Sequence, residues 1–452
     1  MRIITAVLFL CITVVTQAQS SLPVIKISAN KRFFQTADGK PFFWLGDTGW
    51  LLFGKLKKDE VLTYLDARQQ QGFNVIQSMV LHEMTVANVT LGPALINKNA
   101  ATPNVKEGPD NDYWDNIDFV VTEAAKRGIY MALVPVWGSN VKGGHVSVEQ
   151  AKAYGKFLGE RYKKYSNIIW LNGGDVHGTD IKAVWEALGA AIKQYDPVHI
   201  MTYHPRGRYS SSEWFHNASW LDFNMFQSGH RNYVQDTSKN DKNHYGEDNW
   251  RHVQHDYNLK PTKPTIDGEP SYENIPHGLH DSLQPRWQAS DLRRYAYWSV
   301  FAGGAGFTYG ENAIMQFHTK GDKDANYGVT QGWRQTLQAP GANQMKYLKQ
   351  LILSKSYFDR VPAQQIIVDN DQERYNYILA TKGKGYAMAY TYTGRDFSIN
   401  FAKLGFTPKK AFWFAPATGE QTKLALTAKK GIVRFDPPGQ PANGNDWVLV
   451  LE

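Results

Sequence analysis

Two carboxylates, Asp175 and Glu269, each follow a short apolar run of the sequence. Asp175 stands in NIIWLNGGDVHG (167–178), where the apolar run stops at two glycines, and Glu269 stands in PTIDGEP (264–270), where a proline halts strand pairing. Two acids at two strand ends suggest hydrolysis of a sugar linkage, because a pair of carboxyl groups is what most glycosidases use. Simpler roles remain open: Asp175 could be a helix N-cap, and Glu269 could accept hydrogen bonds from loop amides.

The segments around these acids alternate between helix and strand patterns. Helices with one apolar face are predicted to begin at Asp59, Asp112 and Ser147, where Ser147 and Gln150 form a capping box, and an apolar strand pattern follows each helix. Continuing this count gives eight strands. The fold class is therefore α/β, with a (β/α)8 TIM barrel over residues 22–356.

The pattern changes after residue 357. Short alternating strands separated by Gly and Asp turns predict a C-terminal antiparallel β-sandwich over residues 357–452. Met345, Leu348 and Ile352 share one apolar helical face just before the short linker 359–362. We therefore expect the sandwich to pack rigidly on the barrel.

In such a barrel the strand ends converge on one mouth, so strands four and seven should bring Asp175 and Glu269 to the roughly 5–5.5 Å of a retaining glycosidase. By analogy with other retaining barrels, we assign Glu269 as nucleophile and Asp175 as acid/base. Asp267 points to the same side as Glu269 and could perturb either pKa. The predicted substrate-binding residues are Asp47, Trp50, His82, Trp137, His177, His204, Gln227 and Glu311. The tryptophans could equally be core residues, and His82 and His204 structural donors.

No cofactor or metal is predicted. His252 and His255 stand three residues apart without a third ligand nearby, and no G-x-S-x-G motif supports a serine nucleophile. The formal net charge is +8, but lysine and arginine form no block, which argues against a nucleic-acid partner and is compatible with an acidic polysaccharide. Aromatic residues make up 13% of the chain and suit a cleft that stacks on sugar rings.

Residues 1–18 have the pattern of a secretory signal peptide. Arg2 precedes an apolar run from Ile3 to Val15, and Ala18 ends a small-residue cleavage site. The run is too short to span a bilayer as a stable anchor, and no later segment is apolar enough to form a membrane span. The only cysteine, Cys11, lies inside this segment, so no disulfide is expected. We expect a secreted or periplasmic monomer.

Several motifs together resemble one known family. They are WLGDTGW, NGGDVHG, DGEPSYE and YFDRVP, followed by AFWFAPATGE and DWVLVLE in the C-terminal region. The chain resembles the apiosidase-like glycoside hydrolases of family 140, whose barrel precedes a domain named for collagen binding. The resemblance implies that Asp175 and Glu269 are catalytic, and that the enzyme is exo-acting and removes apiose from side chains of the pectin rhamnogalacturonan II. The alternatives are a barrel glycosidase of another specificity and a non-catalytic polysaccharide- or collagen-binding protein.

Overall fold

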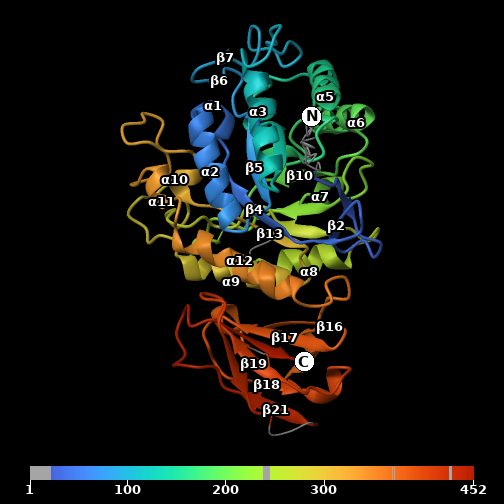
Figure 1. Cartoon of the computed structure of the whole chain (residues 1–452), viewed down its shortest axis with the longest axis vertical. Helices are drawn as coiled ribbons and strands as arrows, with labels where there is room; N and C mark the ends of the chain where they lie inside the picture. The colour runs from blue at the N-terminus through green and yellow to red at the C-terminus, as the bar shows by residue number, and fades with distance from the viewer. Residues whose placement is uncertain (1–21, 238–244, 369, 371, 427–429) are drawn as a thin grey trace, which may run out of the picture.

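The computed structural model describes residues 22–237, 245–368, 370, 372–426 and 430–452, so the predicted signal peptide lies outside the described residues. Two domains are stacked along the long axis of the molecule (Figure 1). Within the described ranges, no helix has the length and apolar character needed to cross a membrane.

Eight parallel strands form the larger domain, as the strand count predicted. They are β4 (Trp44–Thr48), β5 (Val75–Leu81), β8 (Tyr130–Val136), β9 (Ile168–Val176), β10 (Met201–Pro205), β11 (Asn224–Phe226), β12 (Thr265–Asp267) and β13 (Gly306–Tyr309). Hydrogen-bonded neighbours follow the order β10-β9-β8-β5-β4-β13-β12-β11, and β10 and β11 lie beside each other, which closes the (β/α)8 barrel. The strands are buried on both faces, which explains their continuous apolar runs.

Helices surround the barrel. The longer ones are α2 (Lys58–Gln70), α3 (Tyr113–Lys126), α5 (Val148–Tyr162), α6 (Lys182–Tyr195), α8 (Trp250–Asn258), α9 (Ala289–Phe301) and α12 (Pro340–Leu353). Asp112 caps α3 by accepting hydrogen bonds from the backbone N–H groups of Trp114 (2.8 Å) and Asp115 (2.9 Å). Both arms of the predicted capping box between Ser147 and Gln150 are present at α5.

Short strands and short helices lie outside the eight-stranded barrel. The strands are β1 (Ile25–Ile27), β2 (Phe34–Thr36), β3 (Pro41–Phe42), β6 (Ala87–Asn88) and β7 (Gly92–Pro93), and the helices are α1 (Leu52–Lys55), α4 (Gly138–Lys142), α7 (Ser212–Phe215), α10 (Asn312–Met315) and α11 (Trp333–Thr336). Strands β1, β2 and β3 form a small antiparallel sheet, in which Phe34 packs edge-on against Phe223 at 5.0 Å between ring centroids. The short helices α1, α4, α7 and α10 follow the ends of barrel strands, where periodicity in the sequence is weakest.

The C-terminal domain is the predicted antiparallel sandwich. One sheet has the order β14-β16-β17-β22-β19-β20 and the other β15-β18-β21. The strands are β14 (Val361–Pro362), β15 (Ile367–Val368), β16 (Leu379–Gly383), β17 (Tyr386–Thr391), β18 (Phe397–Asn400), β19 (Ala411–Phe414), β20 (Gln421–Leu424), β21 (Ile432–Phe435) and β22 (Trp447–Leu451), with 3-10 turns η1 (Gln364–Ile366), η2 (Arg374–Asn376) and η3 (Phe401–Lys403). Phe397, Trp413 and Leu449 lie in the core between the sheets.

Helices α9 and α12 lie between the barrel and the sandwich (Figure 1). On α12, Met345, Leu348 and Ile352 are buried, as their spacing predicted. Tyr297 of α9 stacks on Tyr390 of β17, with ring centroids 4.9 Å apart and planes inclined by 16°. One apolar cluster therefore runs from the barrel into the sandwich without a break.

Candidate active site

A cleft of about 510 Å³ lies where the barrel strands end. Six residues predicted from the sequence line it: Trp50, His82, Trp137, Asp175, Gln227 and Glu269. The strand-end pattern thus brings both predicted catalytic carboxylates to one cavity, together with two indole rings and two polar side chains. Gln227 is buried, and its Oε1 has no hydrogen-bond partner among the described residues.

The end of β9 is shaped to present Asp175. Gly174 has φ +126°, and a Cβ atom there would lie 2.5 Å from Cε3 of Trp137 and 2.9 Å from the backbone nitrogen of Gly138, so a side chain does not fit. Asp175 itself has φ +56°, a left-handed conformation that Asp tolerates better than most residues. It does not cap α6, which begins at Lys182 after an Ile181 N-cap. The carboxylate instead opens onto the cleft.

The environment of Asp175 favours the protonated acid. Asp175 is exposed to the cleft, but the protein atoms of the cleft walls displace part of the water around its carboxyl, and this desolvation, followed by the negative charge of Glu269, raises its pKa to about 6. Positive charge on His204, His230 and Arg206 opposes part of the rise. A carboxyl with this pKa keeps its proton in mildly acidic solution, which a general acid requires.

Glu269 follows β12 and is held between two histidines. Nε2 of His230 is hydrogen-bonded to Oε1 at 3.0 Å, and Nε2 of His204 lies 3.0 Å from Oε2, an ion-pair distance. Burial alone would raise the pKa of Glu269, but the contacts with His204 and His230 outweigh it and hold this pKa at about 2. The side-chain partners are imidazoles rather than loop amides, and the carboxylate stays ionised, as a nucleophile must.

Aromatic side chains form the wall beside Glu269. The indole N–H of Trp50 donates to the hydroxyl of Tyr272 at 3.1 Å, and burial together with the Glu269 charge raises the pKa of Tyr272. The ring of Trp50 lies 5.3 Å from that of Trp137 and 5.3 Å from that of His204. Trp50 and Trp137 therefore join the apolar core and also face the cleft, so neither sequence interpretation excludes the other.

Comparison with known proteins places this geometry in a family. Residues 28–359 match the model described as "Apiosidase-like, catalytic domain", and residues 361–452 match "Putative collagen-binding domain of a collagenase". The chain belongs to the apiosidase-like family. A search of curated protein sequences found no match.

Solved structures support the same assignment of this apiosidase-like chain. A protein described as a glycoside hydrolase is 45% identical, with a TM-score of 0.91 over 95% of this chain and 96% of its own. A glycoside hydrolase family 5 protein from Bacteroides vulgatus is 42% identical, also with a TM-score of 0.91, over 95% of this chain and 93% of its own. The chain is a glycoside hydrolase with a TIM barrel.

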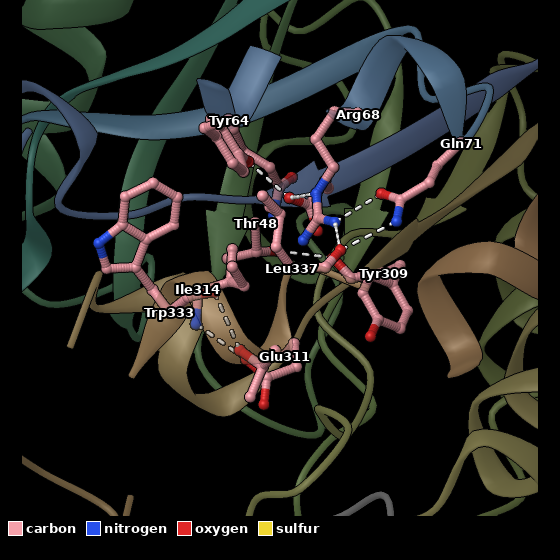
Figure 2. A network of polar contacts seen from close by, with 12 residues as sticks. Thr48, Tyr64, Arg68, Gln71, Tyr309, Glu311, Ile314, Trp333 and Leu337 are labelled. Carbon is pink, nitrogen blue, oxygen red and sulfur yellow. Dashed lines mark hydrogen bonds and ion pairs between the residues drawn. The ribbon is translucent and has the colours of Figure 1, made fainter. Parts of the chain in front are cut away.

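Two predicted substrate contacts of the apiosidase-like enzyme, Asp47 and Glu311, are not part of the cleft lining. Figure 2 shows Glu311, together with Tyr64 and Arg68, which contact Asp47. Asp47 points outward from β4, where its Oδ2 accepts hydrogen bonds from the hydroxyl of Tyr64 (2.5 Å) and Nε of Arg68 (2.6 Å). Glu311 caps α10, because its Oε2 accepts from the backbone N–H groups of Ala313 (2.8 Å) and Ile314 (2.9 Å). Both carboxylates are buried and bound by donors of the fold, although Oδ1 of Asp47 has no hydrogen-bond partner among the described residues, and this corrects the expectation that they face the substrate.

Two predicted histidines lie next to the cleft rather than in its lining. His204 is fully buried and contacts Glu269, so it tunes the carboxylate. The ring of His177 lies 4.6 Å from that of Tyr209, and its Nε2 is 3.5 Å from a guanidinium nitrogen of Arg206. His82 does line the cleft, and its side chain is 30% exposed.

Asp267, predicted to perturb a catalytic pKa, supports the neighbouring loop instead. Its Oδ2 accepts hydrogen bonds from the hydroxyl of Ser228 (2.6 Å) and the amide of Asn249 (2.9 Å). Burial raises the pKa of Asp267 to about 7. The carboxyl thus fixes the segment after β11, which carries His230.

Sequence reasoning missed His230 and Tyr272 in the apiosidase-like site. His230 follows Gln227 by three residues in a loop, and Tyr272 lies within the quoted DGEPSYE motif. The position of Tyr272 within the DGEPSYE motif could have identified it as a site residue. His230 lies in a loop, where no helix or strand periodicity indicates which side chains face the cleft. The pair His252 and His255 lies elsewhere: His252 stacks on Phe226, and within the described part of the chain no cluster of three or more His, Cys, Asp or Glu has a metal-binding arrangement.

Proposed function

We propose that this enzyme is a retaining, exo-acting glycosidase of family 140 that releases apiose from rhamnogalacturonan II side chains. The observation that carries the proposal is the pair of carboxyls at one cleft with opposite pKa shifts, about 6 at Asp175 and about 2 at Glu269. Opposite shifts assign one proton donor and one ionised nucleophile.

The proposed reaction has two steps. Asp175 gives its proton to the glycosidic oxygen while a Glu269 oxygen bonds to the anomeric carbon, so the aglycone leaves as an alcohol and a glycosyl ester remains. Asp175, now a carboxylate, then takes a proton from water as the water oxygen attacks the anomeric carbon. The ester bond breaks, Glu269 regains its charge and Asp175 regains its proton.

The cleft's charge supports an acidic substrate. Arg206 and Arg231 line the cavity near the two carboxyls, and cationic groups there attract the carboxylates of a galacturonate-containing chain. Trp50 and Trp137 offer indole faces on which a sugar ring can stack. The signal-peptide pattern supports a secreted or periplasmic location, where we propose that the enzyme acts as a monomer on such a polymer.

Substitution of each carboxyl tests the assigned roles. Glu269→Gln should lower kcat at least about 1000-fold on every substrate, because no ester can form. Asp175→Asn should cost about 100- to 10,000-fold on natural linkages and much less on an aryl glycoside, whose leaving group needs no proton. The melting temperature should change little in either variant. Full activity in both variants would refute the site.

Product analysis tests the linkage and the stereochemistry. Pectic fragments incubated with the enzyme should release apiose, and NMR of the first-formed sugar should show the configuration of the substrate. Inversion would refute the retaining mechanism. Release of a hexose, or cleavage within a polymer backbone, would indicate another barrel glycosidase specificity.

A further inference from the structure

The C-terminal domain contacts a segment of the barrel that carries cleft residues. The ring of Tyr375 lies 5.4 Å from that of Tyr233, and the guanidinium of Arg374 lies 4.9 Å from the centre of the same Tyr233 ring. Tyr377 stacks on Trp250 with ring centroids 4.5 Å apart and planes inclined by 10°. The sandwich therefore contacts the barrel at two points after β11, at Tyr233 and at Trp250, the first residue of α8.

A buried carboxylate joins these two parts of the molecule. Glu247 is fully buried and accepts hydrogen bonds from the Tyr375 hydroxyl (2.8 Å), a guanidinium nitrogen of Arg294 (2.5 Å) and the backbone N–H of Tyr233 (3.3 Å). A buried charge is stable only when its oxygens are paired. The Tyr375 hydroxyl is the partner that the C-terminal domain supplies.

The segment fixed in this way leads directly to the proposed nucleophile. Tyr233 is three residues beyond His230, and Arg231 between them lines the cleft. His230 in turn is hydrogen-bonded to Glu269 and packs edge-on against Tyr272, with ring centroids 4.7 Å apart. A shift in the position of Tyr233 therefore changes the position of the His230 imidazole, which is hydrogen-bonded to the Glu269 carboxylate.

We propose that Tyr375 is a positioning residue for catalysis: through Glu247 and Tyr233, the C-terminal domain fixes His230 against Glu269. This inference rests on the proposed role of Glu269 as nucleophile. It gives the sandwich a part in the active site that is separate from binding a polymer or covering apolar surface.

The chain offers a matched control at the same domain junction. Tyr386 is another tyrosine of the sandwich, and its hydroxyl donates to the backbone oxygen of Ser356 at 3.2 Å. Ser356 lies after α12 and is not part of the cleft lining. Tyr375→Phe and Tyr386→Phe each remove one hydroxyl and retain the ring, so both variants should fold.

The test is to measure kcat/KM for hydrolysis of pectic fragments as a function of pH, for both variants and for the wild-type enzyme. Tyr375→Phe should lower kcat/KM about 3- to 10-fold, the effect of losing part of a hydrogen bond to a charged group, and should move the acidic limb to higher pH. The limb moves because a looser His230 lets the pKa of Glu269 rise from about 2. Tyr386→Phe should change neither quantity.

A second readout needs no substrate. The imidazole NMR signal of His230, assigned by its loss in His230→Gln, should shift in Tyr375→Phe and remain in place in Tyr386→Phe. If Tyr375→Phe behaves as wild type in both readouts, or if Tyr386→Phe shows the same changes, the proposal is overturned. A shifted His230 signal in an enzyme that cleaves no pectic substrate would support this inference while refuting the proposed function.

Discussion

Asp175 and Glu269 carry the same functional group, and their surroundings make them chemically different. The two imidazoles on Glu269 stabilise its negative charge, whereas Asp175 meets desolvation and the negative charge of Glu269 itself. Glu269 thus helps to determine the protonation state of Asp175. Removing the charge of Glu269 should lower the pKa of Asp175 toward that of an ordinary aspartate.

The pH dependence of hydrolysis should report these two groups. The proposed mechanism requires Glu269 ionised and Asp175 protonated, so kcat/KM should fall as the pH rises through about 6, where Asp175 loses its proton. Arg206→Gln should move this basic limb to higher pH, because the Arg206 charge favours ionised Asp175. Initial rates from pH 3 to pH 9 measure the limb.

Arg434→Gln provides a control for the change in net charge. Arg434 pairs with Asp396 on the exposed surface of the sandwich, so its loss should leave the limb in place. A basic limb that stays fixed in Arg206→Gln, or that lies well above pH 8 in the wild-type enzyme, would contradict the role of Asp175 as the titrating acid.

Residues at strand ends were predictable, and residues in loops were not. Asp175, Glu269 and Gln227 each end an apolar run, so the strand pattern alone assigns them to the barrel mouth. Loop backbones follow no period, which is why His230 was missed. Asp47 was misassigned because a strand end has two sides, and periodicity in a doubly buried strand does not tell the inner from the outer.

At the scale of elements, a buried ion pair between Asp47 and Arg68 connects β4 to α2. Asp47 and Arg68 both have fully buried side chains, and Arg68 also donates to the side chain of Gln71 (2.6 Å) and the backbone oxygen of Leu337 (3.1 Å), as Figure 2 shows. The pair therefore links the first barrel strand, the helix that follows it and a segment near the end of the barrel.

Breaking this pair should destabilise the fold without changing the chemistry. Asp47→Asn leaves the Arg68 charge without its carboxylate and should lower the free energy of unfolding by about 3–5 kcal/mol. Urea titration measures this change, while kcat per folded molecule should stay at the wild-type value. Asp66→Asn, which loses an exposed pair with Arg127, should cost less than about 1 kcal/mol. Reduced kcat with unchanged unfolding energy would instead make Asp47 a substrate contact.

The order of elements was predictable because each strand and helix carries its own local signal. The capping residues Asp112 and Ser147 mark helix starts in the sequence and in the structure. The four-residue helices α1, α7, α10 and α11 were not predicted, because one helical turn gives no period to detect and depends on tertiary contacts.

At the scale of the whole molecule, the two domains share a buried interface. The Arg293 guanidinium contacts the Asp446 carboxylate at 2.6 Å, with both side chains less than a tenth exposed, next to the stacked rings of Tyr297 and Tyr390. Charged and aromatic groups of this kind are stable only while both domains are present. The sandwich thus completes the surface of α9 and α12.

Deleting the sandwich should therefore damage the barrel. A chain ending at Ser356 uncovers Tyr297 of α9, which stacks on Tyr390 of the sandwich, and leaves Arg293 without Asp446, so we expect aggregation and a lower melting temperature. Light scattering and thermal unfolding of the truncated and full chains measure both effects. A soluble truncation with full activity would contradict this role. Polymer binding by the isolated segment from residue 357 onward would instead favour the alternative of a non-catalytic polysaccharide-binding protein.

The closing pair of the barrel differs from the other neighbours. Among the described residues, β10 and β11 stand side by side at the two ends of the strand order without pairing into a ladder. Individual hydrogen bonds join this pair instead, from the backbone N–H of Asp222 to the Met201 carbonyl (2.8 Å) and from the Thr202 hydroxyl to the Phe223 carbonyl (2.5 Å). His204 lies on β10 and His230 follows β11, so the two imidazoles that contact Glu269 come from the two strands that are not paired with each other. The spacing of β10 and β11 therefore sets the distance between the two imidazoles that contact the carboxylate.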